Sequence, residues 1–554
     1  MRNPIKLLGA IALSVVAAFG VSACGSSSSS SSGGKSGGTA TALFGTAADS
    51  LDPQFGYTTQ AAEPDWVVYT PLLTYRHASG TAGGELIPGL ATGQPQISAD
   101  GLTWTLTLRK GLTYSTGAPV KASDFAYTIL RALKLNWGGK AFYTTYIKGA
   151  AEADKGKTKT ISGIATDDAT GKITIRLLKP YGAFGNVLAF PSSGLVPTGT
   201  PMTNQPNTPP PGDGPYMFGS VAPNKGYSLV QNPRFAAQSI PDIPKGHLKQ
   251  INVQVVSTPQ QEAQQVLNNT ADSFDPADEL PGSVLSQIQS QASDRYKPET
   301  TAQNYYFFLN TKSKPFSNQL AREAVNYALD RRAFVKQAAG ALTPACFFLP
   351  PQVVGHPAGQ CPYGGDPNGA PDLAKAKQLV QQSGMAGTAL TVWGENVSPR
   401  KDYVDTYTSV LNQIGFKATE KLIARATYFN TIGNAKTPNV QTGFADWQQD
   451  FPNPSDFYLL MDGNAIQPVN NQNFSNVNDP HIQSELAALN KVPAGQLSTV
   501  APRWQALDTY VASKAYQAVY GYNKSPMFLS KRLDFASAIF HPVYFDDYTS
   551  WKLK

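Results

Sequence analysis

Side chains that could carry out catalysis are few and widely separated in this sequence. Its five histidines show no metal-ligand spacing, because they lie far apart: His77, His247, His356, His481 and His541. Beyond residue 40 there is no Gly-x-Ser-x-Gly nucleophile motif and no His-Glu-x-x-His zinc motif. Two pairs of adjacent acids, Asp167-Asp168 and Asp546-Asp547, are expected to be solvated. We therefore expect no enzyme, no metal site and no cofactor, although a catalytic triad can assemble from distant positions.

The three cysteines are a single residue near the start and a later pair. Cys346 and Cys361 bracket a segment rich in proline and glycine, and a disulfide closing a loop of this size is worth ~3 kcal/mol in the chain-entropy estimate. The alternative is a metal site that includes His356, but further ligands at the usual spacing are missing nearby. We expect the disulfide, which forms in an oxidising compartment.

Cys24 follows a segment typical of a secretory signal. Residues 1–23 have a basic head, an apolar stretch over 7–19 and small residues before the cysteine. The junction Val21-Ser22-Ala23-Cys24 resembles a bacterial lipobox, in which the thiol takes a diacylglycerol group; the alternative is a plain signal and an incidental cysteine. The Ser/Gly-rich residues 24–40 favour lipidation, because a segment that cannot pack is a tether. Acyl chains such as palmitate would then hold the protein at the extracytoplasmic face of a membrane, at the cell surface or in the periplasm.

Composition indicates an ordered protein of several lobes. The 554 residues exceed the ~150-residue prior for one domain. Hydrophobic residues make up 41% and charged residues only 15%, which argues against a disordered chain. The net charge of +7 shows no Lys/Arg stripe, so we expect no binding of nucleic acid.

Hydrophobic periodicity predicts the elements. Leu102, Trp104, Leu106 and Leu108 alternate with polar residues, as in a half-buried strand. Residues 315–340 show one apolar stripe at helical spacing and are expected to form one helix that ends at a glycine. Helix and strand patterns then alternate over 372–422, which predicts a partly parallel sheet. We expect two α/β lobes with a change of character near residue 301.

One segment carries a family resemblance. Residues 100–128, DGLTWTLTLRKGLTYSTGAPVKASDFAYT, resemble the signature of the peptide/nickel class of solute-binding proteins of bacterial ABC importers, the oligopeptide- and dipeptide-binding family. Collinear motifs continue at 51–53, 232–235, 307–334, 372–384 and 444–457.

The resemblance implies a two-lobe α/β clamshell like that of periplasmic binding proteins, with an extra subdomain in lobe one. Lobe one would span 41–300, with the extra subdomain at 75–190. Lobe two would span 301–517, and 518–554 would return to lobe one. Such lobes close on a ligand by hinge motion.

The resemblance also implies a function. The chain would be the monomeric substrate-binding component of an ABC importer, with a peptide as cargo and a permease coupled to an ATPase as partners. Because the fold does not fix its cargo, an oligosaccharide, an opine or a metal chelate stays open. A secreted hydrolase is the alternative from a different class.

Two charged residues are implied as the poles of the ligand site. Asp450 lies in a segment that looks like the family's aromatic-x-x-Asp motif, in which the carboxylate receives a peptide's amino terminus. The alternative is that Asp450 caps the turn before Pro452. Arg400 stands where relatives of the dipeptide-binding type present an arginine to the ligand's carboxylate, and otherwise it is a solvated residue at a helix start.

Four further residues are expected near the ligand. Trp447 is the aromatic residue of the motif, and the others are Tyr57, Trp393 and Asn396. The aromatic side chains among them could equally belong to the core. Near residues 426–428 the sequence lacks a tryptophan that some relatives carry, which leaves the preference for peptides open.

Overall fold

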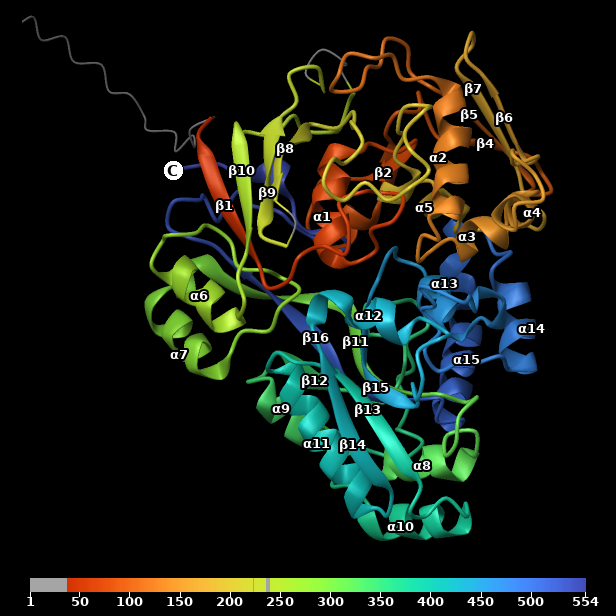
Figure 1. Ribbon diagram of the computed structural model, residues 1–554, viewed down its shortest axis with the longest axis vertical. Coiled ribbons are helices and arrows are strands. Elements are labelled where there is room, and N and C mark those ends of the chain that lie inside the picture. The colour runs from red at the N-terminus through yellow and green to blue at the C-terminus, as the bar shows by residue number, and fades with distance from the viewer. Residues whose placement is uncertain (1–36, 223, 236–239) are drawn as a thin grey trace, which may run out of the picture.

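Lobe one is organised around a four-stranded sheet that brings the first strand beside one from the middle of the chain (Figure 1). The computed structural model describes residues 37–222, 224–235 and 240–554. From edge to edge the strands are β1 (Thr39–Phe44), β10 (Gln250–Val255), β9 (Gly226–Gln231) and β8 (Tyr216–Ala222). β1 runs parallel to β10, and the other neighbours are antiparallel. Residues 39 and 40 therefore belong to this sheet and not to the predicted tether, because their backbone pairs with β10.

An extra subdomain adds a second sheet to lobe one. Its strands, in spatial order, are β4 (Gln96–Ile97), β5 (Thr103–Thr107), β7 (Lys172–Arg176) and β6 (Ile164–Asp167). The predicted alternation holds in β5, where Trp104 and Leu106 are buried and the threonines between and beside them are more exposed. Helix α2 (Ala122–Lys134) contacts β6 and β7 and covers the apolar face of this sheet.

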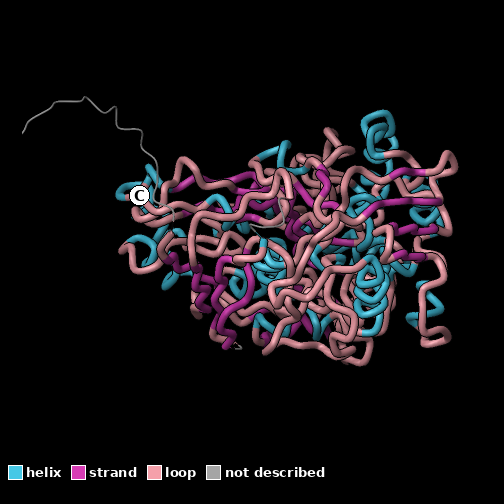
Figure 2. Tube along the Cα trace, turned by 90° about the horizontal axis from the view of Figure 1, so that it is seen from above, coloured by secondary structure: helices cyan, strands magenta, loops and turns pink. Residues whose placement is uncertain are grey.

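The remaining elements of lobe one are short. They are α1 (Thr59–Val68), α3 (Ala141–Thr144), α4 (Ala150–Asp154), α5 (Phe184–Val187), α6 (Pro259–Leu267), α7 (Gly282–Gln291), and the hairpins β2–β3 (Leu73–Tyr75, Leu86–Pro88) and β17–β18 (Phe540–His541, Phe545–Asp546). Seen from above, loops and turns make up much of the visible trace (Figure 2), as expected from 48 glycines and 42 prolines.

The end of the chain is part of the core of lobe one. The ring of Tyr544 lies 4.9 Å from that of Trp66 in α1, and His541 lies 4.5 Å from the same ring. Asp547 Oδ2 lies 2.8 Å from Nδ1 of His77, and both side chains are buried. The two predicted acid pairs differ accordingly: Asp546 and Asp547 are buried and not solvated, because these contacts replace water, whereas Asp167 and Asp168 are exposed.

Lobe two contains a six-stranded mixed sheet. Its strands, in spatial order, are β12 (Leu342–Pro344), β16 (Gln517–Phe528), β11 (Tyr296–Leu309), β15 (Thr442–Gln448), β13 (Ala389–Glu395) and β14 (Lys417–Ile423). β13 is parallel to both β14 and β15, which confirms the prediction of a partly parallel sheet. The carboxyl ends of these three strands therefore lie at one edge.

Helices cover this sheet and extend beyond it. They are α8 (Gln319–Ala328), α9 (Arg331–Gln337), α10 (Leu373–Gln382), α11 (Arg400–Gln413), α12 (Arg425–Ile432), α13 (Pro454–Phe457), α14 (Pro480–Leu489) and α15 (Ala501–Ser513). The single helix predicted over 315–340 is wrong, since the chain breaks between α8 and α9. Leu329 is extended, and the side chain of Asp330 accepts a hydrogen bond from the amide of Arg332, which starts a new helix.

Two antiparallel strands, β11 and β16, cross between the lobes (Figure 1). Their pairing is continuous except for register shifts, one of which lies between Thr300 and Asn304. Beyond β16, Leu529 bridges to Ser273, which in turn bridges to Ala42 in lobe one. The predicted boundary at 301 therefore falls inside β11, and that at 517 falls at the first residue of β16.

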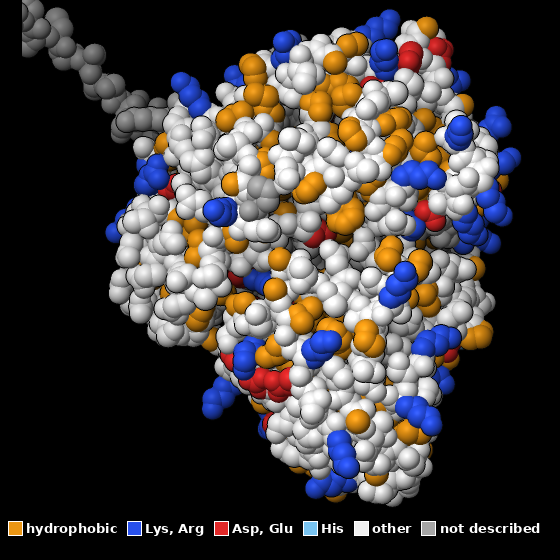
Figure 3. All heavy atoms as spheres, viewed as in Figure 1, with side chains coloured by type: hydrophobic (Ala, Val, Ile, Leu, Met, Phe, Trp, Pro, Cys, Tyr) orange, Lys and Arg blue, Asp and Glu red, His pale blue; other side chains and the backbone are white. Residues whose placement is uncertain are grey.

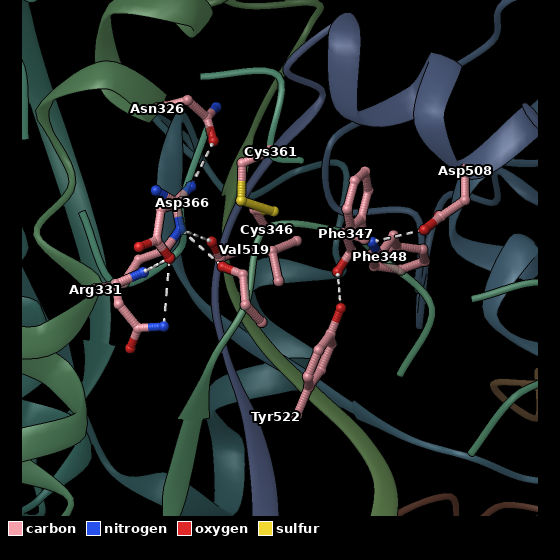
Figure 4. Close-up of a disulfide and its surroundings, with 12 residues drawn as sticks. Asn326, Arg331, Cys346, Phe347, Phe348, Cys361, Asp366, Asp508, Val519 and Tyr522 are labelled. Carbon is pink, nitrogen blue, oxygen red and sulfur yellow. Dashed lines mark hydrogen bonds between the residues drawn. A yellow bond between two sulfur atoms is a disulfide. The ribbon is translucent and has the colours of Figure 1, made fainter. Parts of the chain in front are cut away.

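A disulfide joins Cys346 to Cys361 in the loop that follows β12 (Figure 4). The loop is fixed to neighbouring elements on both sides. Tyr522 donates to the carbonyl of Phe347 at 3.0 Å, and the amide of Phe348 donates to Asp508 at 3.1 Å. His356, the alternative metal ligand, lies with Nδ1 2.7 Å from the carbonyl oxygen of Leu349.

A buried ion pair fixes the loop that leads to Tyr57. Arg131 of α2 is fully buried and binds both oxygens of Asp52, at 2.5 and 2.6 Å. It also donates to Gln54 and to the carbonyls of Pro201 and Thr203. A bidentate guanidinium can satisfy several loop acceptors at once, which lysine cannot do.

We expect Arg131→Met to lower the free energy of unfolding by ~3–5 kcal/mol, because it leaves the Asp52 carboxylate buried without its partner. Chemical denaturation followed by tryptophan fluorescence measures this. The matched control is Arg76→Met, whose partner Glu85 is exposed, and it should leave the unfolding midpoint nearly unchanged. Equal effects of the two substitutions on the free energy of unfolding would contradict a stabilising role for the buried pair of Arg131 and Asp52.

Candidate ligand-binding site

A cavity of about 170 Å³ lies between the two lobes. At ~10–15 Å³ for each water position, this is room for on the order of a dozen waters, which suits a small solute. Lobe one contributes Asp49, Tyr57 and Trp137 to its lining, and lobe two contributes Phe429 and Asp450. In the space-filling view the surface is hollowed where the lobes meet (Figure 3).

Asp450 lies just beyond the carboxyl end of β15 and faces lobe one. The hydroxyl of Tyr57, from the other lobe, donates to its Oδ2 at 2.5 Å. Among the described residues, no group donates to its Oδ1. Below the turn, Asp456 accepts from the amide of Asp450 at 2.8 Å and from the indole of Trp447 at 3.3 Å. The turn is thus held by Asp456, which leaves the Asp450 carboxylate directed into the cavity.

Aromatic rings surround this carboxylate. Tyr57 meets Trp137 edge to face at 5.0 Å and Trp447 at 6.1 Å. Burial raises the pKa of Asp450 to about 7, and the hydrogen bond from Tyr57 opposes this rise only in part. Burial, followed by the charge of Asp450, raises the pKa of Asp456 well above its ordinary value. A cation that enters the cavity would therefore meet a carboxylate that is poorly solvated and has a free oxygen.

Arg400 lines the cavity, but it is not the solvated residue that was the alternative. Its side chain is only 8% exposed, and its guanidinium lies 3.1 Å from Glu395 and 3.3 Å from Asp446. The same group lies 4.9 Å from the centre of the Phe444 ring. Burial alone would lower the pKa of Arg400, but the carboxylates of Glu395 and Asp446 raise it well above its ordinary value.

Arg425 also lines the cavity, and the sequence analysis missed it. It starts α12, and it forms ion pairs with Asp278 and, at 3.3 Å, with Glu395. Its position is the signal that could have found it: it directly follows β14, whose carboxyl end shares an edge with those of β13 and β15. Ligands of open α/β sheets bind at this edge.

The lobes are bonded to one another through residues 277–279 of lobe one. Arg425 binds Asp278, Tyr403 donates to Glu279, and Arg400 donates to the carbonyl of Ala277 at 3.4 Å. Together with the bond from Tyr57 to Asp450, these contacts hold the clamshell closed.

The structure brings four of the six predicted ligand residues to the cavity: Asp450, Trp447, Arg400 and Tyr57. It does not bring Trp393 or Asn396. Trp393 lies inside the lobe, two residues before the end of β13; its indole donates to the carbonyl of Asn439 at 2.9 Å. Asn396 follows the strand and is exposed. Neither residue belongs to the cavity lining, whereas Glu395 of β13 and Asp446 of β15 do.

The part of the chain that the structure describes contains no group of three or more side chains placed to ligate a metal. Within the same residues, no helix has the length and apolar character that a membrane crossing needs. On the face in Figure 3, Lys and Arg side chains are scattered and form no stripe.

Residues 85–468 match the family described as bacterial extracellular solute-binding proteins, family 5. The chain belongs to this family. Its members are named for binding solutes and not for catalysis, in agreement with the expectation of no enzyme.

Among curated relatives of this family 5 protein, the glutathione-binding protein GsiB of Salmonella choleraesuis (strain SC-B67) is 30% identical over 330 residues. The oligopeptide-binding protein OppA of Bacillus subtilis (strain 168) is 29% identical over 284 residues. These matches cover 58% of both this chain and GsiB, and 50% of both this chain and OppA. The chain thus spans little more than half the length of the curated relatives it matches.

Solved structures confirm the two-lobe fold. A clavulanic acid biosynthesis oligopeptide-binding protein superposes with a TM-score of 0.81 at 21% identity, over 94% of this chain and 96% of the other. The OppA of Haemophilus influenzae, in complex with the peptide RPPGFSPFR, superposes with a TM-score of 0.79 at 16% identity, over 94% of this chain and 100% of the other.

Several buried acids bind protons more tightly in the folded protein than in the unfolded chain. Burial raises the pKa of Asp450, Glu279, Asp508 and Asp546 to about 7 in each case. Unfolded carboxyl groups are ionised well below this pH. Stability therefore falls as pH rises through 7, because the folded state then loses protons that the unfolded state has already lost. His541, whose pKa burial lowers to about 3, acts in the opposite direction, but mainly below pH 6.5.

We expect the melting temperature of the ligand-free protein to fall between pH 6.5 and 8.5. Differential scanning calorimetry across this interval measures the slope. Glu279→Gln keeps an acceptor for Tyr403 and removes one titrating carboxyl, so its slope should be shallower than that of the parent. A melting temperature that stays constant or rises over this interval would contradict the expected direction.

Proposed function

We propose that this chain is the extracytoplasmic substrate-binding component of a bacterial ABC importer. In this proposal it captures a small peptide between its lobes and delivers it, unchanged, to a membrane permease that is coupled to an ATPase. The observation that supports it most is the carboxylate of Asp450, which faces an inter-lobe cavity with one unbonded oxygen. The peptide names of the relatives agree with this cargo.

The mechanism follows from the contacts that cross the cleft. With the lobes open, Asp450 on lobe two is separated from Tyr57 on lobe one. A ligand ammonium bound at Asp450 would supply the positive charge that the Asp450 carboxylate needs once closure removes water from the cavity. Closure would then place the Tyr57 hydroxyl on Oδ2 and bring Arg425 to Asp278. In this proposal β11 and β16, which cross between the lobes, flex as the hinge.

The ligand itself is the first test. We expect mass spectrometry of gently purified protein to reveal co-purified peptides. One defined sugar, opine or chelate would instead support the alternative cargo. Conversion of an added substrate into product would support the secreted hydrolase and remove the transport role.

We expect Asp450→Asn to weaken binding of a peptide with a free amino end by about 30-fold, because truncating a buried charge pair costs ~2 kcal/mol or more. The affinity for the N-acetylated form of the same peptide should change little. Isothermal titration calorimetry compares the two. Asp405→Asn, in an exposed pair with Lys401, is the control. If the two peptides lose affinity equally, Asp450 does not receive the amino end.

Export and lipidation form part of the proposal. Residues 1–23 and Cys24 lie outside the described residues, so these predictions rest on the sequence motif alone. In the proposal the acylated Cys24 holds lobe one at the extracytoplasmic face of the membrane, where the Cys346–Cys361 disulfide is chemically stable.

We expect Cys24→Ser to move the protein from the membrane fraction to the soluble extracytoplasmic fraction, because the thioether to diacylglycerol can no longer form. Fractionation followed by immunoblotting measures the distribution. Cys361→Ser is the matched control and should stay with membranes. A Cys24→Ser protein that still pellets with membranes would rule out the lipid anchor.

A further inference from the structure

The two arginines of the cavity are already neutralised by the protein itself. Among the described residues that line the cavity, Arg400 and Arg425 are the only Lys or Arg side chains. Each contacts two carboxylates, and they share one of them: Glu395 lies 3.1 Å from Arg400 and 3.3 Å from Arg425. Asp446 completes the first pair and Asp278 the second. Three acids thus surround two cations.

A carboxylate on a ligand would gain little from this cluster. To reach either guanidinium, it would have to displace Asp446, Glu395 or Asp278, and the displaced acid would remain buried without a partner. The arginine side chains are themselves only 8% and 9% exposed, so few donor positions face the cavity. The Nη2 group of Arg400 that contacts Asp446 also donates to the carbonyl of Ala277 and to the hydroxyl of Tyr305, each at 3.4 Å.

The other end of the cavity has the opposite character. Asp450 has no Lys or Arg partner among the described residues, and Tyr57 satisfies only one of its oxygens. Asp49 and Asp65 also line the cavity, and no basic side chain is paired with either in the described part of the chain. The lining therefore has acids without a basic partner on one side and offers no unpaired Lys or Arg among the described residues on the other.

We propose that this site places no demand on a ligand carboxylate, so that peptides with a blocked carboxyl end, or with that end outside the cavity, bind as well as free acids or better. This rests on the proposed function and narrows its substrate class. Arg400 and Arg425 determine specificity through their pairing with protein carboxylates, because paired in this way they do not bind the carboxylate of a ligand.

Calorimetric titration of the full chain with four probes tests the proposal. The probes are trialanine, trialanine amide, N-acetyl-trialanine and glutathione. We expect the amide to bind at least as tightly as the free acid, the acetylated peptide to lose about 30-fold for want of an ammonium, and glutathione, with its two carboxylates, to bind more weakly than the amide.

The outcomes separate this inference from the function on which it rests. Binding of the free acid or of glutathione that is at least tenfold tighter than binding of the amide would mean that an arginine binds the ligand carboxylate. The inference would then be overturned, while the peptide-binding role would stand. If none of the four probes binds, the peptide-binding role falls and the inference falls with it.

One substitution should reverse the preference. Asp446→Asn keeps an amide oxygen for the hydrogen bond from Gln303 and removes one of the two charges on Arg400. We expect the affinity ratio of free acid to amide to rise by about 3- to 10-fold, because the guanidinium becomes available to the ligand. Asp405→Asn should leave the ratio unchanged, and a ratio that also stays constant in Asp446→Asn would overturn the role of the paired arginines.

Discussion

The pairing of buried charges across the cleft is the constraint on which the rest of the structure depends. Carboxylates and guanidinium groups that leave water must find partners, or the closed form is not stable. Arg425 finds Asp278 on the opposite lobe, while Arg400 finds Glu395 and Asp446 on its own. Asp450 receives only a neutral hydroxyl, that of Tyr57, and keeps one unbonded oxygen that faces the cavity.

The sheet of lobe two explains how these charges come together. Because β13, β14 and β15 are parallel, residues at their carboxyl ends share one edge although they are far apart in sequence. Glu395, Arg425 and Asp450 reach the cavity in this way. The opposite wall of the cavity is also fixed by a buried ion pair, since Arg131 binds Asp52 and thereby fixes the loop that carries Tyr57. Closure can then move two rigid walls with little change inside either.

Sequence reasoning recovered the fold and named four residues that line the cavity, and where it differs from the structure the causes are physical. Period-two burial in β5 and the parallel strands of lobe two follow directly from side-chain patterns. The break between α8 and α9 was missed, since one apolar stripe continues across the cap at Asp330. Trp393 was expected near the ligand but lies inside lobe two, because residue type and position in the sequence do not show how far along its strand a residue lies from the cavity. Of the two acids paired with Arg400, Asp446 lies 46 residues away, and such a pairing is visible only in three dimensions.

Both ends of the described chain lie in lobe one, and lobe two is inserted between them. The segment 540–546 supplies Tyr544 and His541 to the rings around Trp66, so lobe one lacks part of its interior until this segment is present. A chain that emerges amino end first, from a ribosome or through a membrane channel, therefore cannot finish this lobe during emergence. Lobe one of such a chain stays incompletely packed, and accessible to chaperones, until residues 540–546 have been released.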